Sequence, residues 1–244
     1  MNIIDWIKKH KKIVILSVLG GAVMVAGIGG GGKKALEIVA KIGSLLKGDP
    51  KPRLREIKKR WGNIISKVSL NTGVPEPLIA SVIYQESVSA VSPEKIDTAK
   101  FIGRVEPTGR RCWGDTCRYD TLKGPEYAIS YGLMQIIPYA IIGSKKEIWN
   151  YGGNPSDLFD PEINISVGAR KLKEGYDKYG SWPLAVAAFN AGPGAVSKAF
   201  KTYKWDWEKM ISAKALPEVT RAYLRRVFGK GGILQNANEV WLEG

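Results

Sequence analysis

The chain has 244 residues and a formal net charge of +14, and its 44% hydrophobic content is typical of a globular protein rather than a disordered one. Its single histidine, His10, excludes Ser-His-Asp and Cys-His catalysis and argues against a histidine-ligated metal site. Any chemistry is therefore expected from carboxylates and amides. The basic charge suits an anionic polymer or surface, but the sequence contains no nucleic-acid-binding signature.

The first 52 residues predict a membrane anchor. Residues 1–12 are basic, and residues 13–32 carry no charge. At about 1.5 Å per residue in a helix, this run is about 30 Å long, the thickness of a bilayer core. The preceding lysines favour a cytoplasmic N-terminus and an extracytoplasmic remainder of the chain. A cleaved signal peptide is the alternative. Residues 33–52 are expected to form an amphipathic helix and a linker.

Beyond residue 52 the apolar spacing is mainly helical. Helices are expected from Leu54 to about Asn71, from Pro77, after Asp160, from Ser181 to Gly192 and from Pro217. The expected fold class is mainly α, with one helical domain over residues 53–230 and a tail over 231–244.

Residues 88–129 lack helical periodicity and are expected to form an irregular or β-containing insertion. They contain the two cysteines of the chain, Cys112 and Cys117. A disulfide in an oxidising compartment is the preferred interpretation, and two free thiols are the alternative.

Glu86 has an unusual position in the helix that is expected to start at Pro77. Ile79, Val82 and Ile83 form its apolar face, and Glu86 continues the same stripe. A carboxyl group in apolar surroundings has a raised pKa and carries a proton near neutrality, as a general acid does. The alternative is a glutamate at a helix end that reaches solvent.

Four short segments carry a family resemblance. They are Glu86-Ser87, Tyr131 to Pro138 (YGLMQIIP), Ala188 to Gly194 (AFNAGPG) and Pro217 to Tyr223 (PEVTRAY). In this order and spacing the chain resembles the lytic transglycosylases of the soluble, lysozyme-like superfamily, over roughly residues 53–228. The resemblance implies a lysozyme-like α-helical domain. It also implies cleavage of the β-1,4 bond between N-acetylmuramic acid and N-acetylglucosamine in peptidoglycan, with a 1,6-anhydro product and no cofactor.

The resemblance also implies roles for single residues. Glu86 is expected to be the only catalytic acid and base. The expected substrate-binding or supporting residues are Ser87, Met134, Gln135, Asn190 and Tyr223. For Met134 a place in the core is the alternative, and for Asn190 a local helix cap. Asn164 and Gly168, in a further matching segment, are expected to be structural.

The sequence departs from the family in two places. Phe189 stands where a tyrosine is common, which removes a hydroxyl from the expected cleft. The insertion between Ser87 and Gly132 is much longer than in compact members and is expected over the cleft entrance.

Two other functions remain open at this point. One is a hydrolase similar to goose-type lysozyme, in which an acid of the insertion activates water. The other is a membrane-anchored wall-binding or structural protein without catalysis. Expected partners are peptidoglycan strands and the bilayer, through residues 13–32. The expected use is local opening of the cell wall in phage entry, secretion or conjugation, or wall turnover. Proteins of an envelope-spanning or virion assembly are further expected partners in the first three settings.

Overall fold

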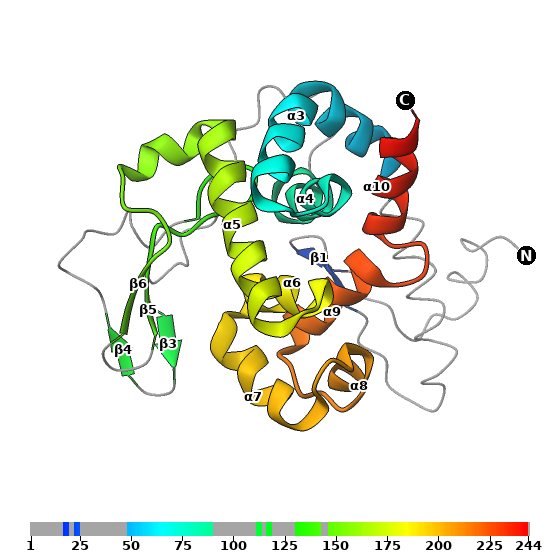
Figure 1. Ribbon diagram of the computed structural model, residues 1–244. Coiled ribbons are helices and arrows are strands. Elements are labelled where there is room, and N and C mark those ends of the chain that lie inside the picture. The colour runs from blue at the N-terminus through cyan, green and yellow to red at the C-terminus, as the bar shows by residue number, and fades with distance from the viewer. Residues whose placement is uncertain are drawn as a thin grey trace, which may run out of the picture. The chain divides into compact units, whose positions relative to one another are not determined.

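The computed structural model describes residues 48–89, 130–138 and 150–243 in full, together with the backbone of six short strands. The chain divides into two compact units, residues 1–50 and residues 51–244. Within the second unit, helices dominate the described residues (Figure 1), which confirms the mainly α fold class.

The strands form three separate antiparallel pairs. They are β1 (Ser17–Leu19) with β2 (Ala22–Met24), β3 (Arg111–Trp113) with β4 (Thr116–Arg118), and β5 (Tyr139–Ile142) with β6 (Lys146–Trp149). The register of β3 and β4 sets Cys112 opposite Cys117. Their side chains lie outside the described residues, so the disulfide stays a prediction.

Apart from the backbone of β1 and β2, residues 13–32 also lie outside the described residues, as do 1–12 and 33–47. The membrane anchor therefore stays a prediction. Among the residues that the structure describes, no helix is long and apolar enough to cross a bilayer.

The helices of the second unit follow one another with short connections, except between η1 and η4, where residues 89–154 intervene. They are α3 (Lys51–Thr72), α4 (Glu76–Ile83), the π-helical turn η1 (Tyr84–Val88), the 3₁₀ turn η4 (Pro155–Phe159), α5 (Pro161–Tyr179), α6 (Trp182–Ala191), α7 (Pro193–Tyr203), α8 (Trp207–Ser212), α9 (Glu218–Phe228) and α10 (Ile233–Leu242). Helix α5 packs against α3 on one side and α6 on the other, while α6 also contacts α7 and α9. Helix α4 packs against α3 and α10 (Figure 1).

Two helices form the centre of the core because their middle residues are apolar on all sides, apart from Ser81 in α4. Residues 78–83 of α4 and 184–188 of α6 are all buried. A helix without a polar face must be surrounded by other elements, and both segments are. The sequence predicts burial of Leu184 to Phe189, and residues 184–188 are buried whereas Phe189 is only partly buried.

The start of α5 follows directly from its sequence. The Asp160 side chain accepts hydrogen bonds from the backbone N–H groups of Glu162 (2.8 Å) and Ile163 (3.0 Å), and Pro161 occupies the first helical position. An N-cap of this kind satisfies two of the otherwise unpaired donors of a helix. At the end of α6, Gly192 adopts φ +82° and Pro193 immediately begins α7.

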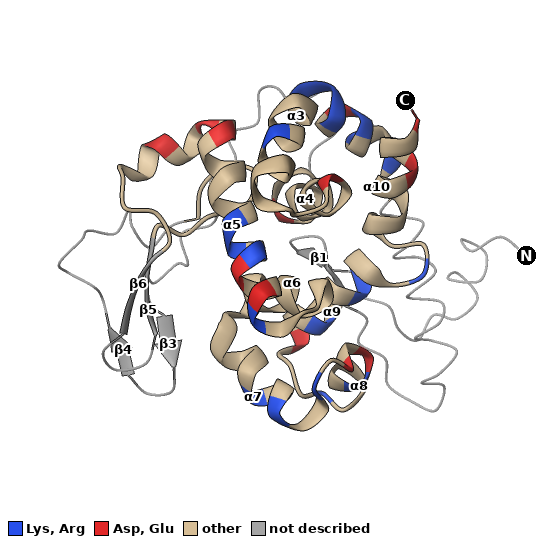
Figure 2. Cartoon of the chain, viewed as in Figure 1, with Lys and Arg blue, Asp and Glu red and all other residues tan. Residues whose placement is uncertain are grey.

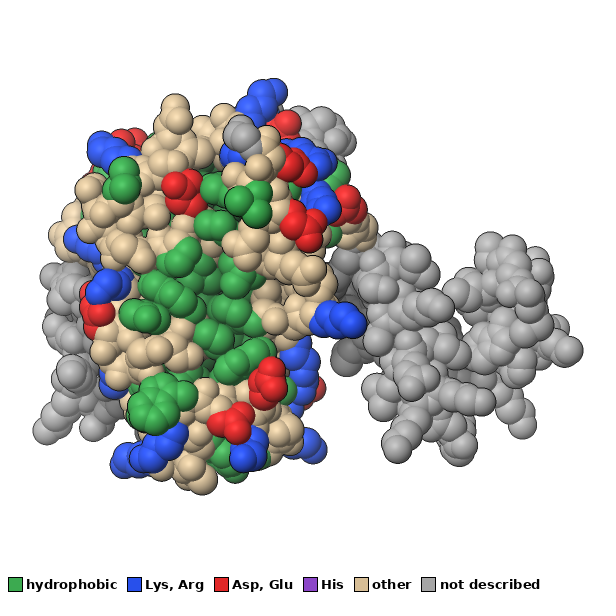
Figure 3. All heavy atoms as spheres, turned by 45° about the vertical axis from the view of Figure 1, so that its right-hand side comes forward, with side chains coloured by type: hydrophobic (Ala, Val, Ile, Leu, Met, Phe, Trp, Pro, Cys, Tyr) green, Lys and Arg blue, Asp and Glu red, His purple; other side chains and the backbone are tan. Residues whose placement is uncertain are grey.

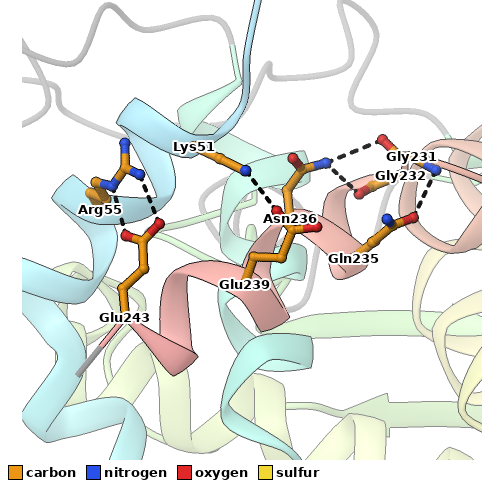
Figure 4. A network of polar contacts seen from close by, with 8 residues as sticks. All are labelled: Lys51, Arg55, Gly231, Gly232, Gln235, Asn236, Glu239 and Glu243. Carbon is orange, nitrogen blue, oxygen red and sulfur yellow. Dashed lines mark hydrogen bonds and ion pairs between the residues drawn. The ribbon is translucent and has the colours of Figure 1, made fainter.

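The C-terminal residues form a packed helix where the sequence suggested a tail. Ile233, Ala237 and Val240 recur on one face of α10 and are buried. Lys51 and Arg55 form ion pairs with Glu239 (2.6 Å) and Glu243 (2.8 Å), as Figure 4 shows. Helix α10 is therefore joined to α3 by both apolar and charged contacts.

A second polar contact joins α10 to the helix that leads to Glu86. The indole Nε1–H of Trp241 donates to the carboxylate of Glu76 at the start of α4 (2.8 Å). The Ser66 hydroxyl of α3 donates to the same oxygen (2.9 Å). Three helices thus meet at one carboxylate.

Charges of both signs are distributed over the second unit, with Lys and Arg prominent on α3 and between α7 and α9 (Figure 2). On the face seen in Figure 3, hydrophobic side chains gather in the middle and charged side chains lie mostly around them.

Candidate active site

Glu86 lies in a π-helical turn at the end of α4 and not in the α-helix itself. The α-helical bonding ends at Ile83, and the N–H of Ser89 donates to the carbonyl of Tyr84 (2.8 Å), five residues earlier. A π turn widens the helix by one residue and shifts the following side chains around its axis; such turns are frequent at functional sites. The Glu86 side chain is partly buried.

The surroundings of Glu86 favour its protonated form. Burial raises the pKa of its carboxyl from 4.5 to about 7, while the hydroxyl of Tyr223 and the positive charge of Arg226 oppose that rise. Removal of water from around a carboxylate disfavours its charged form. A carboxyl group with this pKa can give up and take back a proton near neutrality.

Tyr223 approaches Glu86 from α9. Its side chain is 3% exposed, and burial together with the charge of Glu86 holds the pKa of its phenol well above the usual range. The phenol oxygen of Tyr223 is buried, and it forms no hydrogen bond of standard distance and angle with any residue that the structure describes. The two groups therefore lie close enough to couple their ionisation, at a separation or angle outside that of a standard hydrogen bond.

Arg226 is the charged neighbour of this pair and was not singled out in the sequence. It lies three residues after Tyr223 on α9, hence on the same side of the helix. Its charge favours the ionised forms of both Glu86 and Tyr223. The spacing from Tyr223 was the signal that could have identified it.

Ser87 joins the π turn to a second segment of the site. Its hydroxyl lies 3.1 Å from the carbonyl oxygen of Ile83 and 2.8 Å from that of Leu133. Leu133 belongs to the turn in which Tyr131 and Ile136 exchange backbone hydrogen bonds. Ser87 thus links two of the four resembling segments through the backbone.

The side chain of Asn164 binds the backbone of the Tyr131–Ile136 turn through hydrogen bonds. The Asn164 amide donates to the carbonyls of Tyr131 (2.8 Å) and Leu158 (2.9 Å), and its oxygen accepts from the N–H of Met134 (2.8 Å). Asn164 has no exposed surface. Its expected structural role is confirmed.

Gly132 is required where this turn meets Asn164. Its φ is +69°, and a Cβ there would lie 2.3 Å from both the Asn164 amide nitrogen and the Leu158 carbonyl oxygen. A side chain at this position is excluded both by conformation and by contact.

Met134 lies beneath the turn and has no exposed surface. A Cβ on Gly168 would lie 2.3 Å from its sulfur, so α5 and Met134 are in close contact. In this conformation Met134 supports the site from the core, the alternative left open by the sequence, and does not line it.

Gln135 remains partly exposed in the same turn. Its amide nitrogen donates to the carbonyl of Gly132 (2.8 Å), and its oxygen accepts from the Ser130 hydroxyl (2.9 Å). Its φ of +48° is uncommon for a residue with a side chain. These bonds fix the direction of the amide before any ligand binds.

Asn190 lies in the last turn of α6 and is partly exposed. Its oxygen accepts a hydrogen bond from the hydroxyl of Thr220 on α9 (2.8 Å), and Thr220 is 2% exposed. Because the oxygen faces Thr220, the NH₂ group points away from it. Thr220 was missed in the sequence, although it too lies three residues from Tyr223.

Tyr223 and Arg226 thus lie beside the Glu86 carboxyl, Ser87 ties the turn that carries Glu86 to Leu133, and Asn190 is linked to the helix that carries Tyr223. No cluster of three or more metal-ligating side chains occurs among the described residues. The insertion acids considered in the sequence lie outside them.

Comparison with known proteins agrees with this arrangement. The sequence profile described as "Transglycosylase SLT domain" matches residues 63–211, more than half of the chain. The soluble lytic murein transglycosylase of Salmonella typhimurium is 36% identical over 104 residues, which are 39% of this chain and 15% of that protein. That of Escherichia coli is 35% identical over 103 residues, with the same shares.

The chain therefore aligns with only about a seventh of the length of these curated relatives. Glu86, Met134 and Asn190 lie within the profile match, whereas Tyr223 lies beyond its end. The match over most of the helical unit is nevertheless extensive enough to establish the family. The chain belongs to the transglycosylase SLT domain family.

Proposed function

We propose that the chain is a peptidoglycan lytic transglycosylase in which Glu86 is the only acid and base. The observation that carries the proposal is the Glu86 carboxyl, with its pKa raised to about 7 by burial. Among the described residues, no second carboxylate contributes to that pKa. Glycosidases that use water ordinarily need two carboxyl groups, one as acid and one as base or nucleophile.

The first step uses the protonated form of Glu86. Its proton goes to the glycosidic oxygen between N-acetylmuramic acid and N-acetylglucosamine, and the bond from that oxygen to the muramic C1 breaks. The N-acetyl carbonyl of the muramic acid stabilises the positive charge that develops at C1. The N-acetylglucosamine leaves with a free hydroxyl.

The second step uses the carboxylate that the first step leaves. It takes the proton of the muramic 6-hydroxyl, whose oxygen bonds to C1 and closes a 1,6-anhydro ring. The proton on Glu86 is thereby restored, and no water is consumed. Tyr223 and Arg226, which both favour the ionised carboxyl, stabilise it between the steps.

The substrate's N-acetyl group needs to be held near C1 for this chemistry. We assign that role to Asn190, whose NH₂ group can donate to the N-acetyl carbonyl while Thr220 holds its oxygen. Gln135, already fixed in its turn, is the second proposed sugar contact. Ser87 keeps the π turn and the Tyr131–Ile136 turn together.

One alternative function is hydrolysis of the same glycosidic bond, in which an acid of the insertion activates water. The other alternative is a protein that binds the cell wall without cutting it. Digestion of purified peptidoglycan followed by mass analysis separates them. We expect products lighter by one water than those of hydrolysis, and loss of activity in Glu86→Gln.

The matched control is Glu208→Gln, which removes an exposed carboxyl on α8 and should leave activity unchanged. Products with ordinary reducing ends would show that the enzyme is a hydrolase and not a lyase. An inactive wild type that still binds peptidoglycan would favour the wall-binding protein.

We further propose that residues 13–32 anchor the chain in a membrane with residues 53–230 on the extracytoplasmic side. Their lack of charge and the basic residues before them support this. Local opening of the wall, for secretion, conjugation or phage entry, fits an anchored enzyme. Sequencing of the mature N-terminus decides between an anchor and a cleaved signal peptide.

A further inference from the structure

A cluster of aromatic rings lies on the surface where α5 and α7 end. The ring of Phe200 contacts that of Tyr179 (centroids 5.4 Å apart) and that of Trp205 (5.8 Å). Trp205 stands at an interplanar angle of 86° to Phe200. None of these residues takes part in the contacts around Glu86 described above.

Trp205 is the exposed end of this cluster, with 63% of its surface open to solvent. It lies in the turn between α7 and α8, where Lys204 has φ +52°. The N–H of Asp206 donates to the carbonyl of Tyr203 (3.0 Å), which closes the turn. An ordered turn and the edge of Phe200 therefore hold the indole on the surface, where it remains open to a ligand.

Two lysine ammonium groups lie near the rings of this cluster. The Lys178 ammonium lies 5.3 Å from the centre of the Tyr179 ring, and the Lys204 ammonium 6.0 Å from that of Phe200. Neither forms an ion pair with a residue that the structure describes. Figure 2 shows further basic positions along the end of α7.

The acids next to these lysines in the chain are engaged elsewhere. Asp177 pairs with Lys173. Asp206 caps α8 through the N–H of Lys209 (2.9 Å) and pairs with the Lys209 ammonium (3.4 Å). The cluster therefore combines the exposed ring of Trp205 with two ammonium groups that form no ion pair with a described residue.

We propose that Trp205, Lys178 and Lys204 form a second binding site for the peptidoglycan strand, separate from the catalytic site. The indole face packs on the apolar C–H face of a sugar ring, while the ammonium groups bind carboxylates of the peptide stems. Tryptophan supplies a large rigid contact surface, and exposed charges of opposite sign add attraction that salt screens. The proposal rests on the function proposed above, since it takes the same polymer as ligand.

The test measures binding to insoluble peptidoglycan by co-sedimentation in the Glu86→Gln background, so that the polymer is not cut. Adding Trp205→Ala is expected to weaken binding on the order of tenfold, as loss of a tryptophan contact typically does. Leu70→Ala is the matched control, because Leu70 on α3 is 86% exposed and lies outside the cluster. It should bind as well as the background protein.

Charge is tested separately from ring contact. Lys178→Gln with Lys204→Gln should weaken binding at low salt and reduce its dependence on ionic strength, with the indole still present. In the active protein, Trp205→Ala should slow digestion of whole peptidoglycan while leaving cleavage of a short soluble glycan fragment unchanged. An unchanged unfolding temperature would show that the variant is folded.

Equal binding of the Trp205→Ala and Leu70→Ala proteins would overturn this site while leaving the catalytic proposal intact. Slower cleavage of the short fragment by Trp205→Ala would also overturn it, because the residue would then belong to the catalytic site. Weakened binding to single-stranded nucleic acid, with peptidoglycan binding unaffected, would reassign the cluster to a different polymer and overturn the proposal. A wild type that neither cuts nor binds peptidoglycan would instead refute the proposed function itself.

Discussion

Replacement of Glu86 by glutamine should stabilise the protein by an amount that grows as the pH rises from about 4.5 to 7. Burial raises the pKa of this carboxyl from 4.5 to about 7. With about 1.4 kcal/mol for each unit of pKa, ionised Glu86 then costs the folded state up to about 3 kcal/mol relative to the unfolded chain. Glutamine keeps the size and the hydrogen-bonding amide without that charge.

The stability difference between the two proteins depends on pH, because the folded and unfolded states of the wild type lose the Glu86 proton at different pH values. Below about pH 4.5 the carboxyl is protonated in both states and contributes nothing to the difference. As the pH rises towards 7, the unfolded chain loses this proton first, so the wild type becomes less stable. Above pH 7 both states are ionised and the cost is constant.

Urea unfolding of the two proteins at several pH values measures this directly. The stability of Glu86→Gln minus that of the wild type should be near zero at pH 4.5 and should approach about 3 kcal/mol by pH 8. Other titrating groups are common to both proteins and cancel. Glu208→Gln, which removes an exposed carboxyl on α8, is the matched control. A difference that does not change with pH would refute the assignment of a raised pKa to Glu86.

Three further predictions concern neighbouring contacts. Thr220→Val removes the hydroxyl that holds the Asn190 amide and should raise KM more than it lowers kcat, with Thr220→Ser restoring both; equal kinetics for Val and Ser would contradict this. Asn164→Ala removes one hydrogen bond from each of three backbone groups, of which the Tyr131 carbonyl keeps its bond from the Ile136 N–H, and should lower the free energy of unfolding by about 3 kcal/mol, which urea unfolding can measure. Trp241→Phe removes the hydrogen bond to Glu76 and should lower the free energy of unfolding by about 1 kcal/mol. The dependence of activity on pH should be unchanged; a shifted dependence would show that this contact also affects the pKa of Glu86.

The helices with strong local signals were predictable from the sequence. Asp160-Pro161 begins α5 and the all-apolar run after Pro183 is buried in α6, because caps and hydrophobic periodicity act over a few residues. The short helices α7, α8 and α10 were missed. The apolar positions of α10 recur at helical spacing and were a usable signal, but its partners in α3 and α4 lie 188 and 165 residues away in the chain and cannot be identified from a local pattern.

The position of Glu86 shows the same limit. An apolar stripe ending in a carboxylate was visible in the sequence, but the π turn that carries Glu86 was not. That turn is joined by the Ser87 hydroxyl to Leu133, 46 residues further along the chain. A single long-range hydrogen bond of this kind cannot be predicted from spacing.

Met134 illustrates why a motif residue need not touch a ligand. A family resemblance identifies which residues recur together, and both substrate contacts and packing contacts recur. Only the close approach of Gly168 shows that Met134 belongs to the second kind. Thr220 and Arg226 show the converse: Thr220 lies within the Pro217–Tyr223 segment and Arg226 three residues beyond it, but only the packing of α9 shows that they lie beside the site.

The central claim is that Glu86 alone transfers the proton and that no water enters the reaction. Digestion of peptidoglycan in water enriched in heavy oxygen tests it most directly, because hydrolysis adds one water oxygen to every new muramic end. The mechanism predicts anhydro products without the label, and no products from Glu86→Gln. Labelled muramic ends would contradict it and would point to a second, water-activating acid.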